Sequence, residues 1–315
     1  MDASQIFAEC IGNRIKPIVL QYAPYTDIFE IHPYHHSTDI DFEQQFSDLM
    51  FDSIVFYAYE KAEIEKEYNR GHFDALRDAA RNVYESRVPK TEKLADGLLG
   101  ELALDSFVKC FFSHIQMLYS RVKYLERYPK EEPDGKRTGH EIKGYDSMLF
   151  SVENGRKYMW IGQVKTGEWT YCLGGIKKDI SKSVLRNYFS SAMLIMADIM
   201  RATSDSSEEL QKIIDDINDF CFDYSRDPEI LYSKVHDYFQ KENITVRIPC
   251  LIIADESDYS DEMALLKNIK GKCHTAFDGF AFEDDGLNIE ILLLVFPVRN
   301  LSGLRRKFLD ARVIK

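Results

Sequence analysis

Several features that would assign a function directly are missing from this sequence. Its 315 residues contain neither a G-x-x-x-x-G-K-S/T motif nor a G-x-S-x-G motif, which argues against a P-loop ATPase and against an α/β-hydrolase. The six cysteines are widely scattered and form no C-x-x-C pair, so we expect a reduced protein without a zinc knuckle. The sequence therefore predicts no nucleotide cofactor and no zinc site.

Long apolar runs are also missing. The longest one, residues 289–298, is interrupted by Glu290 and is far too short to cross a membrane, so it predicts a buried strand. The N-terminal residues MDASQIFAEC lack the basic segment and long apolar segment of a secretory signal. We expect a cytoplasmic protein that does not contact a membrane.

Positive charge is scarce overall. The formal net charge is −12 and the sequence pI is about 5.2, which argues against a basic protein that coats nucleic acid. The net charge does not exclude an enzyme that acts on nucleic acid, because the electrostatic field at an active site is local and a bound metal ion is itself a large positive charge. Residues 301–315 carry five basic residues against one acidic residue. An acidic enzyme of this kind is expected to rely on a partner for much of its grip on DNA.

The composition predicts a folded chain with one large domain or two modest ones. Hydrophobic residues make up 45% and aromatic residues 13%, enough for a substantial core. Pro89 follows a run of helical periodicity, and the predicted boundary lies near residue 88. The smaller N-terminal α+β region, residues 1–88, is predicted to contain β-like residues 15–34, a polar linker 35–41, and helices over 42–69 and 73–86.

The larger region, residues 89–315, shows the patterns of an α/β fold. We expect a mixed central sheet flanked by helices. The predicted elements are one helix or two over 91–128, loop 129–143, strands 145–152 and 157–165, a turn at Gly174-Gly175, helices 177–203, 208–224 and 228–242, strand 244–254, a short helix near Leu265, strand 287–298 and a basic helix from Leu301.

The most informative stretch is the predicted hairpin of residues 144–168. Asn154-Gly155 between its strands is a strong turn signal. Asp146 opens the first strand, and Gln163-Val164-Lys165 closes the second. Since side chains alternate along a strand, Gln163 and Lys165 should point the same way and Val164 into the core. An acid, an amide and a lysine arranged in this way can converge on one divalent metal, which suits phosphodiester hydrolysis.

One acid upstream has a fitting context. Glu101 lies in the sequence GLLGELALD, on a helical face shared with Leu98 and Val108. A carboxylate at the edge of an apolar stripe costs free energy to desolvate unless it is paired or binds a metal. Gly97 and Gly100 on the same predicted helix are small enough to let it approach a sheet closely.

The order of these residues resembles the pattern of the PD-(D/E)xK nuclease superfamily. That pattern is an acid on a helix, an Asp that opens a strand, and E/Q-x-K at the end of the next strand. The wider sequence is similar to the HamA effector of the Hachiman anti-phage defence system, in the segments LLGELALDSF, KGYDSMLF, WIGQVKTG, VRIPCLIIA and LNIEILLLVFPV. The resemblance implies a restriction-endonuclease-like core over residues 89–315. It also implies a metal-dependent DNA endonuclease that is controlled by a HamB-like helicase partner.

The resemblance also implies a role for each site residue. Asp146 would be the central metal ligand, with the Gln163 amide oxygen, Glu101 and the backbone carbonyl of Val164 completing the ligand set. Mg²⁺ prefers oxygen ligands and keeps several waters, and Mn²⁺ is the alternative. Lys165 would orient the attacking water and offset charge on the pentacoordinate phosphate.

Gln163 is a departure from the family pattern, which more often has Glu there. A neutral amide removes one negative charge, so the metal should bind more weakly. The alternative function is an inactive or weakly active nuclease-fold subunit that binds and regulates a helicase. A third possibility is action on RNA or another phosphodiester. Three features outside the site are open to a functional interpretation. The histidines of HPYHH (His32, His35, His36) could bind a metal, but we favour a surface linker. The acidic loop 255–262 is expected to be solvated or to face a partner, and Lys177-Lys178 at a predicted helix start could equally meet a phosphate or be solvated.

Overall fold

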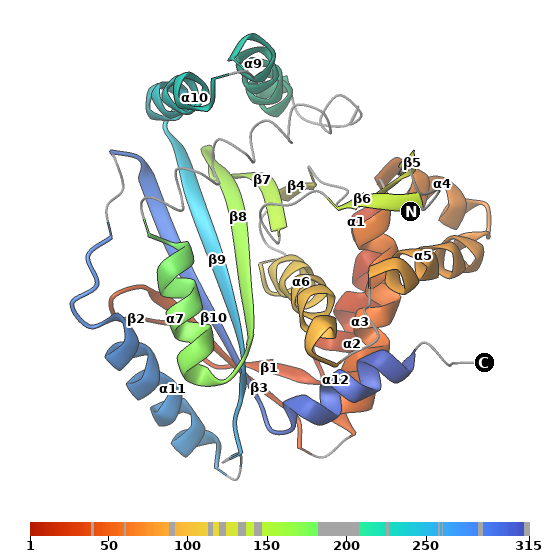
Figure 1. The fold of residues 1–315 in the computed structure, drawn as a ribbon, viewed down its shortest axis with the longest axis vertical. Helices are drawn as coiled ribbons and strands as arrows, with labels where there is room; N and C mark the ends of the chain where they lie inside the picture. The colour runs from red at the N-terminus through yellow and green to blue at the C-terminus, as the bar shows by residue number, and fades with distance from the viewer. Residues whose placement is uncertain are drawn as a thin grey trace.

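The computed structural model describes residues 1–38, 41–59, 61–87, 92–112, 116–119, 124–131, 137–141, 147–181, 208–224, 227–257, 259, 261–282 and 286–311. The described residues form an eight-stranded sheet in the order β1-β3-β10-β9-β8-β7-β4, with β2 beside β3 (Figure 1). Its strands are β1 (Val19–Gln21), β2 (Tyr25–Thr26), β3 (Glu30–His36), β4 (Gln116–Tyr119), β7 (Ser147–Glu153), β8 (Arg156–Gly167), β9 (Ile244–Asp255) and β10 (Asn288–Val298). A separate hairpin pairs β5 (Tyr124–Glu131) with β6 (Arg137–Glu141).

The sheet is mixed. Strands β3, β10, β9 and β8 run parallel to one another, while β7, β4, β1 and β2 pair antiparallel with their neighbours. The parallel strands β9 and β10 are long apolar runs because both of their faces are covered by helices. The predicted α/β class, with a mixed central sheet flanked by helices, is confirmed.

Helices cover both faces of the sheet and build two apolar clusters. One face carries α1 (Ala3–Phe7), η1 (Ala8–Gly12), α2 (Asn13–Ile15), α3 (Phe42–Ala58), α4 (Lys61–Asn69), α5 (Phe73–Arg87), α6 (Glu92–Phe111) and α12 (Leu301–Asp310). The other face carries α7 (Trp169–Asp179), α9 (Glu208–Tyr224), α10 (Pro228–Glu242) and α11 (Glu262–Phe277). Side chains of β8 that alternate in direction therefore enter different clusters.

The predicted hairpin is confirmed and lies inside the sheet. Strands β7 and β8 pair antiparallel from Ser147 opposite Gly162 to Glu153 opposite Arg156. Both turn residues have positive φ, 51° at Asn154 and 76° at Gly155, which a two-residue type I′ turn requires. Asp146 lies outside the described residues.

Several other predicted elements differ from the structure. The helix predicted over 91–128 is wrong beyond α6, because β4 pairs with β7 at the sheet edge and β5 pairs with β6. The helix predicted over 42–69 is two helices, since Tyr59 is extended and ends α3. Gly174-Gly175 is not a turn but lies inside α7, which begins at Trp169. Part of the predicted loop 129–143 belongs to β5 and β6.

Elements from the first 88 residues contribute to the same sheet and core as later elements. Strand β3 pairs with β10, and α3 packs against both α6 and α12. The predicted boundary near residue 88 falls outside the described residues, and the division of the chain into 1–88 and 89–315 stays a prediction.

Candidate active site

The C-terminal half of β8 presents different chemistry on its two faces. Gln163 and Lys165 lie opposite Cys250 and Ile252 of β9, whose side chains belong to the cluster beneath α7. Val164 packs instead against the cluster beneath α6. This is the alternation expected of a strand, and it puts the amide and the lysine on the same face.

Helix α6 approaches the other face of β8 closely at Gly100. A Cβ atom at Gly100 would lie only 3.0 Å from the Val164 side chain and 3.2 Å from the Thr166 hydroxyl, so any larger residue would crowd β8. Gly97 is exposed and has open space around its Cα, so it does not serve the same purpose. The expectation of a small residue at the contact is confirmed for Gly100 alone.

Glu101 is buried, with 5% of its surface exposed. Its carboxylate accepts a hydrogen bond from the Tyr57 hydroxyl of α3, so at least one oxygen has a partner inside the helical layer. Figure 1 shows α6 and α7 on opposite sides of β8. The structure therefore brings Gln163 and Lys165 together beneath α7, and it places Glu101 in the layer on the other face.

Gln163 is 6% exposed, and its side-chain nitrogen Nε2 has no hydrogen-bond partner among the described residues. An unpaired buried amide group costs about 1–3 kcal/mol, so this position is one where a further ligand is expected. The oxygen and nitrogen of an amide are nearly indistinguishable in shape, and the oxygen can occupy the unpaired position by rotation of the group. The amide oxygen of Gln163 can therefore serve as one ligand of a hard cation such as Mg²⁺.

Lys165 forms an ion pair with Asp179, the last residue of α7. Its methylenes run beside Gly175, where a Cβ atom would lie 2.9 Å from Lys165 Cε. Sequence reasoning missed Asp179, because the helix was expected to begin at residue 177 and to run past it.

The three histidines of HPYHH do not lie in a surface linker. His32, His35 and His36 belong to β3, an inner strand, and all three are buried. The His36 ring is stacked between Phe42 and Tyr259, with 4.2 Å between ring centroids on each side. His32 is paired with β10, and His35 and His36 are paired with β1. The sequence of these polar residues carries no hydrophobic signal of their burial.

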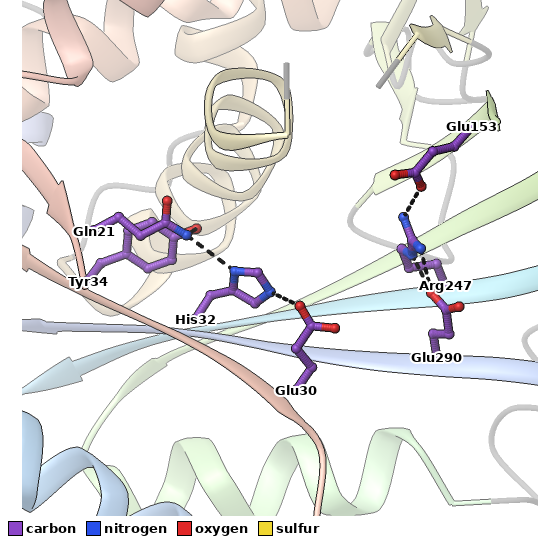
Figure 2. Close-up of polar contacts among 7 residues, drawn as sticks. All are labelled: Gln21, Glu30, His32, Tyr34, Glu153, Arg247 and Glu290. Atoms are coloured by element: carbon purple, nitrogen blue, oxygen red, sulfur yellow. Dashed lines mark hydrogen bonds and ion pairs between the residues drawn. The ribbon is translucent and has the colours of Figure 1, made fainter. Parts of the chain in front are cut away.

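His32 lies in a polar network on the sheet (Figure 2). Its Nδ1 lies 3.2 Å from the Gln21 amide nitrogen, and its Nε2 lies 2.8 Å from a Glu30 carboxylate oxygen. Burial lowers the pKa of His32, against the opposing effect of Glu30. Burial likewise lowers the pKa of His35 and of His36.

Acidification is expected to destabilise the fold through these histidines. Their pKa values in the folded protein lie below the ordinary value of 6.5, so the unfolded chain binds more protons. The free energy of unfolding should be fully retained above that value and fall as the pH drops below it. Urea unfolding between about pH 7.5 and pH 5.5 measures the loss. His36→Phe keeps the stacking and should reduce the loss, whereas a change at the exposed His72, His72→Gln, should not; equal losses in both variants would contradict the assignment.

A second network in Figure 2 centres on Arg247 of β9. Its guanidinium donates to Glu290 of β10 at 2.7 Å and to Glu153 of β7 at 3.2 Å. The same group stacks over the rings of Tyr158, at 4.0 Å from the centroid, and Trp160. This network joins strands in the N-terminal half of β9, and its charges are paired with one another, so we assign it a structural role.

The predicted acidic loop is only partly solvated. Glu256 is buried, and its carboxylate accepts hydrogen bonds from Trp169 of α7 at 3.1 Å and from Asn268 and Lys272 of α11 at 2.6 and 2.9 Å. The prediction of a solvated loop is wrong for Glu256, because the end of β9 brings it between two helices.

An open groove of about 820 Å³ lies between α7 and α11. Trp169, Leu173 and Lys177 line it from α7, but Glu101, Gln163 and Lys165 do not contribute to its lining. Lys177 lies in the last turn of α7, not at a helix start, and donates to the Ala276 carbonyl at 3.0 Å. The polar pair on β8 is thus separate from this groove.

Comparison with known proteins identifies a family. A family model described as HamA matches residues 22–311. No curated protein and no solved structure matches the chain. In the described part of the chain, no helix is long and apolar enough to cross a membrane, and no group of three His, Cys, Asp or Glu side chains is arranged to hold a metal ion.

Proposed function

Because the chain belongs to the HamA family and thus to Hachiman anti-phage defence, we propose that it is the metal-dependent DNA endonuclease of that system. The observation that carries the proposal is the polar end of β8. There Gln163, buried with an unpaired amide atom, and Lys165, held by a carboxylate, project from one face beneath α7. An amide oxygen and an ammonium two residues apart on one strand suit a metal and a phosphodiester side by side.

The proposed metal is Mg²⁺ or Mn²⁺. The Gln163 amide oxygen, the Val164 backbone carbonyl and Asp146 would hold it, together with water molecules. The ion, when bound, would polarise the phosphate and lower the pKa of a bound water. Lys165 would hold the attacking water and offset charge on the phosphate, with no need for a further cofactor.

Glu101 needs its own test as a metal ligand, because it comes from the helix on the other face of β8 and is bonded to Tyr57. Glu101→Gln is expected to weaken Mg²⁺ binding if the carboxylate reaches the metal. Calorimetric titration with Mg²⁺ measures this directly and separates it from a loss of stability, which Tyr57→Phe should also produce.

The neutral side chain at position 163 gives a prediction for metal affinity. Gln163→Glu adds a negative charge at the proposed metal and is expected to tighten Mg²⁺ binding by about tenfold, which corresponds to about 1.4 kcal/mol. Calorimetric titration of the purified chain measures it. Gln240→Glu, an exposed change on α10, is the matched control and should leave the affinity unchanged. Equal affinity in all three proteins would place the metal elsewhere.

A second candidate function is a binding subunit that regulates a HamB-like helicase without cutting DNA. The neutral side chain of Gln163 favours this function, because it offers a metal no negative charge. The described residues also include no group of three His, Cys, Asp or Glu side chains that could hold a metal ion. The two functions are distinguished by plasmid cleavage and Mg²⁺ titration of the chain with its helicase partner. Neither cleavage nor Mg²⁺ binding is expected of a purely regulatory subunit. We further propose that the chain acts in the cytoplasm. We also propose that its substrate is DNA rather than RNA, and a panel of labelled DNA and RNA substrates would test the choice of substrate.

A further inference from the structure

We infer that Asp179 is a positioning residue for Lys165, and that it supplies the negative charge that position 163 lacks. The inference rests on the proposed function, because it concerns how the lysine of the site is held. Lys165 is near the end of β8 and Asp179 is the last residue of α7. The helix that follows the strand thus returns a carboxylate to the strand's own lysine.

The ion pair is largely shielded from water. The Lys165 side chain is 22% exposed and that of Asp179 is 14% exposed. A charge in such a place costs free energy to desolvate, and each group of the pair offsets part of that cost for the other. A paired ammonium also keeps one orientation, whereas an exposed lysine samples many rotamers.

Helix α7 is shaped to let the lysine reach this acid. At Gly175 a Cβ atom would meet three methylene carbons of Lys165, at 2.9 Å, 3.0 Å and 3.2 Å. The glycine therefore leaves a channel along which Lys165 runs to Asp179, one turn further along the helix. A glycine inside a helix lowers its stability by about 1 kcal/mol relative to alanine. The close passage of the Lys165 side chain explains why a glycine is found at position 175.

The negative charge of Asp179 also supports its pairing with Lys165. An acid in the last turn of a helix opposes the helix dipole and is unfavourable there without a nearby cation. Gln163, two residues before Lys165 on the same face, carries no charge and cannot hold the ammonium by an ion pair. A Glu at that position would supply a carboxylate beside the lysine, and here α7 supplies one.

The chain contains a matched pair for comparison. Lys157 lies on the same strand and face as Lys165 and is paired at 3.2 Å with Glu242, the last residue of α10. The side chains are 17% and 22% exposed, close to those of the Lys165 pair. This pair lies at the opposite end of β8, away from Gln163. Glu242→Gln therefore controls for the loss of a half-buried ion pair as such.

The experiment measures plasmid cleavage kinetics of the chain together with its helicase partner. Asp179→Asn is expected to lower kcat by about 100-fold with KM changed by less than about threefold, because a displaced catalytic group slows the chemical step. Glu242→Gln should leave kcat unchanged, and Asp179→Glu should retain more of kcat than Asp179→Asn. In a Lys165→Met background, Asp179→Asn should have no further effect. Mg²⁺ affinity by calorimetry should be the same in wild type and Asp179→Asn.

Each other outcome overturns the inference in a recognisable way. An Asp179→Asn variant that cuts as fast as wild type removes the positioning role and leaves the proposed function in place. A loss of Mg²⁺ binding in that variant makes Asp179 a metal ligand instead. Equal losses of kcat in Asp179→Asn and Glu242→Gln reduce the effect to general destabilisation. A wild-type chain that cuts no DNA with its partner defeats the proposed function and the inference with it.

Discussion

Replacing Lys165 is expected to slow plasmid cleavage severely while the protein stays folded. The ammonium is the only charge that the proposed mechanism places against the phosphate from β8, and loss of one such group costs about 100-fold to 1,000-fold in kcat. Lys165→Met is the preferred change because its side chain still fills the channel beside Gly175. Cleavage of supercoiled plasmid, with Mg²⁺ and the proposed helicase partner present, measures the loss. Asp146→Ala is expected to have the same effect.

The matched control is Lys157→Met, on the same strand and face but in the pair with Glu242. Both variants lose a half-buried ion pair, so their thermal stabilities should fall by similar amounts. Only Lys165→Met should lose cleavage. A Lys165→Met protein that cuts as fast as wild type would rule out the site on β8.

The packing of α6 on β8 gives the largest expected effect on stability. Gly100→Val puts a branched side chain where even a Cβ atom lies 3.0 Å from Val164 and 3.2 Å from Thr166. Both neighbours belong to a strand that is paired with β9 at these positions, so its backbone cannot move freely. Overpacking of this kind costs about 1–3 kcal/mol, and the helix must shift outward. Urea unfolding measures the change.

Gly97→Val in the same helix is the control. Gly97 is exposed and has no heavy atom within 4 Å of an added Cβ atom. Valine is also the better helix former, so this change should be neutral or slightly stabilising. Equal destabilisation by both changes would show that helix propensity, not contact with β8, decides the effect. Because Glu101 follows Gly100, cleavage by Gly100→Val also reports whether the position of Glu101 matters.

Local patterns were sufficient for the hairpin and for several helices and strands. Asn154-Gly155 can adopt positive φ at little cost, and the alternation of residues 157–165 places Gln163 and Lys165 on one face without knowledge of the fold. The ends of β9 and β10 were also predictable, since long apolar runs are bounded by polar residues. These features depend on contacts close in sequence.

Other features depend on distant contacts and were predicted wrongly. Residues 112–128 have apolar residues at helical spacing, yet edge pairing with β7 makes residues 116–119 a strand. His35 and His36 look like linker residues, yet both are buried in β3, where they pair with β1 and the His36 ring stacks between Phe42 and Tyr259. In each case tertiary pairing outweighs the local preference.

The sequence by itself determined the α/β class, the central hairpin and the grouping of Gln163 with Lys165, because strand alternation and turn chemistry act over a few residues. Only the tertiary structure decided what surrounds that pair. It put Glu101 in the layer across β8, bonded to Tyr57, and it brought Asp179 from the end of α7 to Lys165. Both depend on which face of the sheet each helix covers, and that is set by how the whole chain buries its apolar surface.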